Sequence, residues 1–363
     1  MGKSCSVILG SKAAVGFRLS GKLTAQVERQ DRVRTMAETM QLDHLIVADW
    51  LSWLQTLIAM LPVWMKPLWI VVVGVPAGFF ILWLVLQLMA RFAPRVAAIM
   101  RITSKEATSQ PLFYILLAIG VTMLLLAPIM PYNTFGEDIK LLKAEGLTLI
   151  KLLAIILAVW TASVSISEEV EGRTALTVLS KPVARWKMLV GKFFGVMLPV
   201  IVMFLILGGL LLCAVSYKVK YDAREVARPD PTVQECRDEM LQSVPGLGLA
   251  FLEAVVMASV AAAISTRFPL IPNLLICASI YALGHLLPTV VIETADRLEF
   301  VAFVAKLLAV VLPGLEFFSM ETAIATGRSV SLHYLGLAGL YSLVYITLAL
   351  LLGLLLFEDR DLA

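Results

Sequence analysis

The chain has 363 residues, of which 60% are hydrophobic and only 16% are charged. Soluble domains average about 45–50% apolar and about 25% charged residues. So few charged residues cannot cover the surface of a soluble protein. A chain this apolar would not stay disordered either. Soluble globular proteins and disordered proteins are therefore both excluded. A net charge of +3 gives no reason to expect nucleic acid as a partner, and none is predicted. The class that remains is a polytopic membrane protein embedded in a lipid bilayer.

The first 40 residues predict a poorly structured extension or a misplaced start, with Met36 and Met40 as alternative starts. Residues 16–23 fall one residue short of a phosphate-binding loop, because Leu23 stands where Ser or Thr would hold magnesium. No strand precedes this stretch, so we interpret the match as chance.

Residues 41–100 are expected to hold an interfacial helix and one extra N-terminal span. The stretch 45–64 is long enough to cross a membrane but carries Asp49, Gln55 and three tryptophans, a mixture typical of the membrane interface. A full crossing of this stretch stays open as the alternative.

Seven apolar runs predict transmembrane helices, because about 20 residues of helix cross the hydrocarbon core. They must be helices, since a lipid-facing backbone has to satisfy its hydrogen bonds internally. The predicted fold is therefore an all-α polytopic membrane protein with about seven transmembrane helices, eight if 45–64 also crosses. The runs are 67–90, 111–131, 147–167, 193–216, 246–266, 270–290 and 334–357.

The stretch 299–320 contains Lys306 and Glu316 with Pro313–Gly314 between them. We therefore expect an interfacial or re-entrant segment here rather than a crossing.

Basic residues gather in three short connecting stretches, 91–110, 168–192 and 265–272. Even numbers of predicted spans separate them, so all three can face the cytoplasm, as the positive-inside rule requires. The same rule predicts a cytoplasmic C-terminus. The expected location is the cytoplasmic (inner) membrane. The mixed stretch 217–245 is expected to be a small solvated loop on the outer side.

The stretch 168–192 is the most informative of the three. Its leading acids (Glu168, Glu169 and Glu171) favour a helix N-terminus, an apolar patch follows, and Pro182 ends any helix. A short amphipathic helix of this kind is a surface for another protein. The alternative interpretation is a solvated loop whose basic residues only fix the topology.

The order of residues in this stretch resembles the cytoplasmic signature of ABC-2-type transporter permeases. That signature runs Glu-x-Glu-x-Gly-Thr, then Leu-x-Ser-x-Pro, then Arg, and ends on Gly-Lys at the next span. The chain departs from it at Arg173, which separates Gly172 from Thr174. The entry segment 101–120, the turn 265–267 and the C-terminus are similar to the same family. The resemblance thus covers 101–363 as a permease core of six spans, with a coupling loop at 168–192 and an outer loop at 217–245.

The resemblance implies a permease subunit of an ATP-binding cassette transporter that moves a substrate with ATP hydrolysed by a separate ATPase subunit. It also implies a second permease chain, identical or related, to complete the path. The chain itself is not expected to be an enzyme or to hold a cofactor or a metal. The residues expected to dock the ATPase are Glu169, Glu171, Arg173, Thr174, Leu176, Leu179, Ser180, Pro182, Arg185 and Lys192.

Three ionisable residues fall within the predicted spans, where such groups are functional candidates by default. Glu253, expected about two turns into its helix, either lines the transport pathway or pairs with a neighbour. Lys151 is expected to snorkel toward the outer surface, and His285 to lie at the interface.

Two other functions stay open from the sequence. One is a membrane scaffold that binds an ABC ATPase without transport. The other is a membrane-embedded lipid-modifying enzyme, although the sequence shows no cluster of His, Asp or Ser near one membrane face.

Overall fold

The computed structural model describes residues 61–130, 138–171, 184–225, 229–294, 303–304, 306–308, 311–319, 323 and 330–358, with the side chains of 167–171, 287–294 and 358 outside the description. The chain divides into two units, Met1–Pro62 and Val63–Ala363. The interfacial helix expected at 45–64 and the extension 1–40 lie almost wholly outside the described residues. The second unit, Val63–Ala363, is called here the helical unit.

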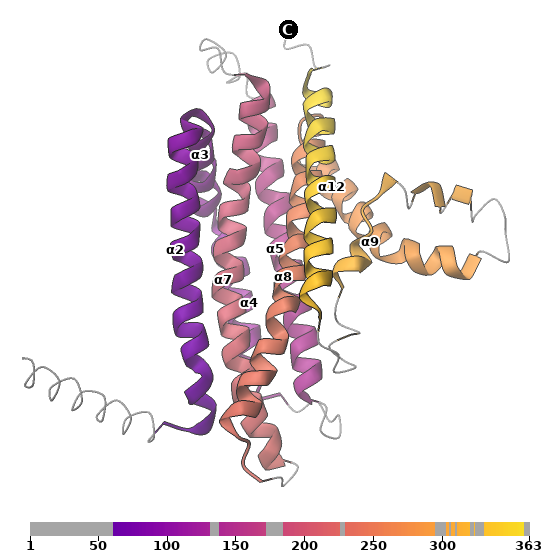
Figure 1. Cartoon of the computed structure of the whole chain (residues 1–363). Helices are drawn as coiled ribbons and strands as arrows, with labels where there is room; N and C mark the ends of the chain where they lie inside the picture. The colour runs from indigo at the N-terminus through magenta and orange to yellow at the C-terminus, as the bar shows by residue number, and fades with distance from the viewer. Residues whose placement is uncertain are drawn as a thin grey trace, which may run out of the picture. The chain divides into compact units, whose positions relative to one another are not determined.

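The helical unit contains no strand in its described part (Figure 1), which confirms the all-α prediction. Its elements, in chain order, are η1 (Val63–Leu68), α2 (Trp69–Phe92), α3 (Pro94–Ser109), α4 (Pro111–Leu126), α5 (Asp138–Glu171), α7 (Arg185–Glu225), α8 (Val233–Ile264), α9 (Leu270–Thr294), η2 (Leu315–Phe318) and α12 (Leu332–Glu358).

Five of the described helices are long and apolar enough to cross a membrane. The α3–α4 pair makes a sixth if its bend of 63° lies within one broken span, and α9 offers a shorter apolar stretch, Leu270–Leu286. All seven predicted runs therefore fall on helices, while length and composition support five or six spans. The five long stretches are Val63–Phe92, Asp138–Ile166, Arg185–Glu225, Val233–Ile264 and Leu332–Phe357.

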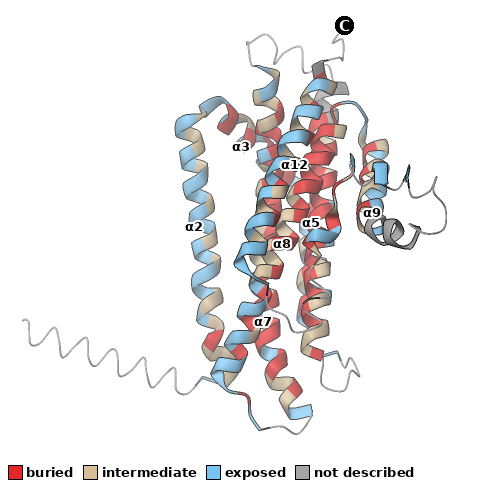
Figure 2. Cartoon of the chain, turned by 45° about the vertical axis from the view of Figure 1, so that its right-hand side comes forward, coloured by how far each residue is buried: buried red, intermediate tan, exposed pale blue. Residues whose placement is uncertain are grey.

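Helices α5, α7 and α8 pack against one another and form the core of the unit. Helix α12 covers α8, and α3 lies along the first turns of α7. Helix α2 has no buried residue, and Figure 2 shows it exposed along its length. Its exposed side chains, such as Trp69, Val72 and Phe80, are large and apolar. A continuous apolar surface of this size suits lipid rather than water.

Close helix contacts in the unit depend on glycine. A Cβ on Gly195 of α7 would lie 2.6 Å from the Cβ of Thr103 and 3.0 Å from the carbonyl oxygen of Met100, both on α3. A Cβ on Gly353 of α12 would lie 2.8 Å from the Cα of Ala263 on α8. Small residues of this kind let membrane helices approach backbone to backbone.

The expected outer loop at 217–245 is mostly helix. Helix α7 continues to Glu225 and α8 begins at Val233, so only residues 226–232 lie between them. The N-terminus of α8 is fixed by a capping box, in which Thr232 and Glu235 exchange side-chain and backbone hydrogen bonds. The prediction of a loop was wrong because most of the charged residues of this stretch lie on extensions of the two helices.

The broken segment 311–319 packs against α8, α9 and α12 and is tied to tyrosines of α12. The Gly314 amide donates a hydrogen bond to the Tyr341 hydroxyl at 3.0 Å. The hydroxyls of Tyr334 and Tyr345 donate to the carbonyl oxygens of Phe317 (2.6 Å) and Val311 (3.2 Å). Non-helical backbone at membrane depth needs such internal partners. The described residues of 299–320 thus fit the re-entrant interpretation, with Leu315 and Phe318 buried.

Candidate functional site: a buried ionic cluster and the helix ends of one face

The three ionisable residues selected from the sequence meet inside the helical unit. Glu253 on α8 is fully buried, and its two carboxylate oxygens face different helices. Oε2 lies 3.4 Å from Nζ of Lys151 on α5, and Oε1 lies 2.9 Å from Nε2 of His285 on α9. One carboxylate therefore links α5, α8 and α9. We call these three residues the ionic cluster.

One sequence prediction about this cluster was wrong. Lys151 does not snorkel: only 4% of the residue is exposed, and its ammonium group faces Glu253. His285 contacts Glu253, and its expected position at the interface stays a prediction. Because α8 begins at Val233, Glu253 also lies near the middle of its helix, about 30 Å from the first residue at 1.5 Å per residue.

Of the two alternatives for Glu253, the structure shows pairing with neighbouring residues. A lone charge in a membrane interior is costly, and an opposite charge nearby offsets much of that cost. The pairing is incomplete, since Oε2 makes no hydrogen bond to any described residue. Whether this carboxylate also lines a pathway stays a prediction.

His285 connects the cluster to the surface. Its side chain is 25% exposed, whereas those of Lys151 and Glu253 are 6% and 0% exposed. Its ring packs edge-on against Tyr281 on the same helix, with centroids 4.8 Å apart. His285 is therefore the most exposed member of the cluster.

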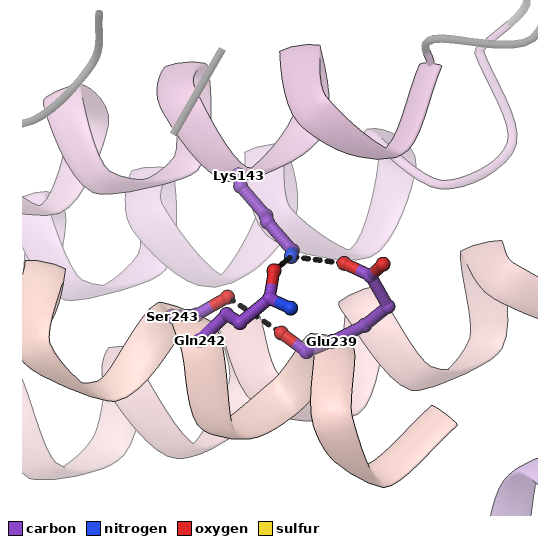
Figure 3. A network of polar contacts seen from close by, with 4 residues as sticks. All are labelled: Lys143, Glu239, Gln242 and Ser243. Carbon is purple, nitrogen blue, oxygen red and sulfur yellow. Dashed lines mark hydrogen bonds and ion pairs between the residues drawn. The ribbon is translucent and has the colours of Figure 1, made fainter. Parts of the chain in front are cut away.

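A second polar zone lies where α5 and α8 begin and α7 ends. Lys143 of α5 contacts the carboxylate of Glu239 and the amide oxygen of Gln242, both on α8 (Figure 3). Ser243 donates a hydrogen bond to the Glu239 carbonyl oxygen at 3.1 Å. Buried Lys218 of α7 pairs with Asp138 at 3.0 Å.

Carboxylate oxygens of Asp138, Asp222 and Glu225 come within 4.8 Å of one another in this second zone, a donor set that a divalent cation could use. Lys218 already supplies positive charge to Asp138 at the same place. This ion pair accounts for Asp138, one of the two buried acids of the set.

Sequence reasoning missed this second zone. Its signal was the charged stretches 138–145 and 235–242 beside apolar runs, which hydropathy assigns to loops. These stretches continue as helix because their charged residues pair with residues of neighbouring helices. The sequence alone does not show which helices become neighbours.

At the opposite end, α5 extends to Glu171, so the backbones of Glu169 and Glu171 belong to its last turn. The sequence predicted that these acids begin a helix, and that prediction was wrong. A helix C-terminus disfavours acidic residues electrostatically, so the dipole argument does not explain their position. The remaining predicted docking residues from Arg173 to Pro182 lie outside the described residues, namely Arg173, Thr174, Leu176, Leu179, Ser180 and Pro182.

Arg185 and Lys192 both lie on α7, which begins at Arg185. Arg185 is half-buried, with its guanidinium carbon 5.9 Å from the ring centroid of Phe357 on α12. Lys192 is 2% exposed and donates a hydrogen bond to the carbonyl oxygen of Ser165 on α5. Lys192 therefore joins α7 to α5 and offers no surface charge to a partner.

The helix ends at this face come from distant parts of the chain. Ile166 of α5, Arg185 and Lys192 of α7, Thr266 after α8 and Phe357 of α12 line one small hollow. Helix α3 packs on α7 at Gly191 and Gly195, close to the same end. The stretches predicted to share one side of the membrane thus lie at one end of the helical unit, called here the docking end.

No protein-family model matches the chain, and no curated protein matches it either. The resemblance to ABC-2-type permeases therefore rests on the order of residues in the sequence alone.

Proposed function

We propose that the chain is the membrane-embedded permease subunit of an ATP-binding cassette transporter. A separate ATPase subunit would dock on residues 168–187 and supply the energy of ATP hydrolysis. The observation that carries the proposal is the order of residues in 168–192, from the paired acids through Ser180-Lys-Pro182 to Gly191-Lys192. The docking contacts would come from Glu169 and Glu171, which suit basic groups on the ATPase, and from Leu176 and Leu179, which supply apolar contact.

The helices that flank the docking segment suit transmission of force. Helices α5 and α7 belong to the core, and Lys192 ties them together beside the segment. Lys151 lies 20 residues before Glu171 on α5, about 30 Å along the helix. Displacement of the segment would thus reach the ionic cluster through one continuous helix. Movement of two such chains relative to each other would alternate access to a path between them.

The same proposal fixes the topology. The docking end carries the basic stretches and would face the cytoplasm by the positive-inside rule, together with the end of α12. The helical unit would then cross the cytoplasmic membrane seven times, with α3 lying at the interface and α4 and α9 each counting as a span. A second permease chain would complete the path.

Charge reversal at the docking segment tests the proposal. In the variant Glu169→Lys/Glu171→Lys, two attractive contacts with the ATPase become repulsive. We expect co-purification of the ATPase to fall at least about tenfold, the effect of about 1.4 kcal/mol. ATP-driven transport should be lost, while the protein still inserts into membranes.

A matched control is Asp230→Lys/Asp238→Lys, which makes the same change of charge at exposed positions on the far end of the unit. This control should retain the ATPase. Equal loss from both variants, or no loss from either, would contradict docking at 168–187.

A further inference from the structure

We propose that the outward side of helix α3 binds the headgroups of anionic phospholipids. This side carries the exposed residues Arg95, Arg101 and Lys105, with the exposed Ile102 among them, and we call it the basic face. The proposal goes beyond the proposed function, since it requires only that the helical unit lies in a bilayer and involves no ATPase.

Helix α3 is amphipathic. Val96, Met100 and Thr103 are buried on the side that packs on α7. At about 3.6 residues per turn, the three basic side chains fall on the other side of the helix, and all three are exposed. Their charges therefore point away from the core of the helical unit.

The basic face carries an excess of positive charge. Three basic residues against one acid, the half-buried Glu106, give α3 a net charge of +2. Among the described residues, none of the three basic side chains forms an ion pair. Each Lys or Arg held near an anionic membrane surface strengthens binding about fivefold. The charges of α3 thus complement the phosphate groups of anionic lipids.

The position of α3 suits the level of the headgroups. The apolar stretch of α2 ends at Arg91, and the apolar helix α4 begins at Pro111, so α3 connects two helices that suit the hydrocarbon core. Helix α3 lies beside the end of α2 (Figure 1, Figure 2). Three charged side chains would be costly inside the hydrocarbon core, whereas the headgroup region satisfies them.

Two large apolar side chains favour a lipid surface over an acidic protein as the ligand. Phe92 at the end of α2 is 80% exposed, and Ile102 on the basic face is 70% exposed. Interfacial helices insert such side chains at the acyl-chain boundary while their basic residues stay at the phosphates. Phe92 also joins the basic face to the exposed apolar surface of α2. A bilayer covers both surfaces at once.

Photo-crosslinking of the full chain in defined vesicles tests the proposal. A photoreactive residue replaces Ala98, which is exposed between Arg95 and Arg101. The vesicles are phosphatidylcholine with a trace of radiolabelled lipid, either anionic phosphatidylglycerol or phosphatidylcholine with the same acyl chains. In about 10 mM salt, where charges are little screened, capture of phosphatidylglycerol should be at least about fivefold greater. In about 1 M salt, where the Debye length is about 3 Å, most of this preference should be lost.

Two variants separate the effect of charge from an effect on the fold. Arg95→Gln/Arg101→Gln/Lys105→Gln removes the three charges at exposed positions, so it should capture the two lipids equally at both salt concentrations. Arg95→Lys/Arg101→Lys changes the same arginines but keeps their charges, so it should retain the preference for phosphatidylglycerol. Loss of the preference in the lysine variant as well would contradict recognition by charge.

The matched control is Arg224→Gln/Arg237→Gln/Lys306→Gln, which neutralises two arginines and one lysine that are exposed elsewhere on the helical unit. This control should keep the wild-type preference. Equal capture of the two lipids by the wild type, or a preference that survives in the α3 glutamine variant, would overturn the proposal. If the wild type prefers neither lipid but the α3 glutamine variant loses a co-purifying protein, the basic face binds that protein and the lipid proposal is wrong.

Discussion

At the scale of single residues, Glu253 is one of the fully buried charged side chains among the described residues of the helical unit. Its carboxylate is fully buried among apolar helices and depends on Lys151 and His285 for compensation. Truncating one partner of a buried ion pair is more damaging than removing both, because the survivor keeps an uncompensated charge. This difference gives the cluster a signature in stability measurements.

Replacement of Glu253 by Gln keeps the shape of the side chain but leaves Lys151 buried without its carboxylate. We expect the free energy of unfolding to fall by about 3–5 kcal/mol. The double variant Lys151→Met/Glu253→Gln removes both charges and should recover most of that loss. Thermal or denaturant unfolding in detergent micelles measures both values.

The exposed carboxylate of Glu316 provides the control, and Glu316→Gln should change stability little. If Glu253→Gln is as stable as Glu316→Gln, the buried pairing of Glu253 does not contribute the expected free energy to stability. The same Glu253 variant tests the pathway hypothesis, since unchanged transport would remove Glu253 from the pathway.

The sequence could select these residues but not bring them together. Glu253, Lys151 and His285 stand out because each is an ionisable side chain in an apolar run. Their meeting depends on the packing of α5, α8 and α9, which no local pattern of hydropathy encodes. For the same reason, snorkelling of Lys151 was the natural prediction for a lysine near the expected end of a span.

At the scale of helices, the contact between α3 and α7 depends on the absence of a side chain at Gly195. Helix α3 buries Val96, Met100 and Thr103 on the face that meets α7. Its sharp bend from α4 coincides with Pro111, which starts α4 and restricts the residue before it. The amphipathic entry segment is thereby held against the core beside the docking end.

Replacement of Gly195 by Ala should destabilise this contact. The new methyl group would lie 2.6 Å from the Thr103 Cβ and 3.0 Å from the Met100 carbonyl oxygen, so α3 must shift. Overpacking of this kind typically costs about 1–3 kcal/mol. The measurement is the free energy of unfolding, together with protease sensitivity of the α3 segment.

Gly336→Ala is the matched control, because nothing lies within 4 Å of a Cβ at that helical position. It should be neutral or stabilising, by up to about 1 kcal/mol, since alanine favours helix over glycine. Similar losses of stability in both variants would mean that close packing at Gly195 does not determine the stability of the contact between α3 and α7.

The existence of the helices followed from the apolar runs, but their ends did not. Hydropathy placed the start of α5 near residue 147 and the start of α8 near 246, whereas they begin at Asp138 and Val233. The added turns contain Lys143 and Glu239, which contact each other across the two helices. A charged residue lowers the hydropathy of a sequence window and so predicts a loop. The same residue can continue a helix when an oppositely charged residue of a neighbouring helix contacts it.

At the scale of the whole helical unit, polar groups separate into three levels. The docking end joins the ends of α5, α7, α8 and α12, the ionic cluster lies within the helices, and the zone of Lys143 and Lys218 lies at the far end. Helices α5 and α8 contribute to all three levels. The basic stretches predicted to share one side of the membrane correspondingly gather at the docking end.

Site-specific photo-crosslinking in native membranes shows whether an ATPase docks on residues 168–187. A photoreactive residue at Leu176 should capture a protein that carries nucleotide-binding motifs. The same residue at Val233, which is 37% exposed at the far end of the unit, should not. Capture of no ATPase from position 176, or of equal amounts from both positions, would contradict docking on this segment.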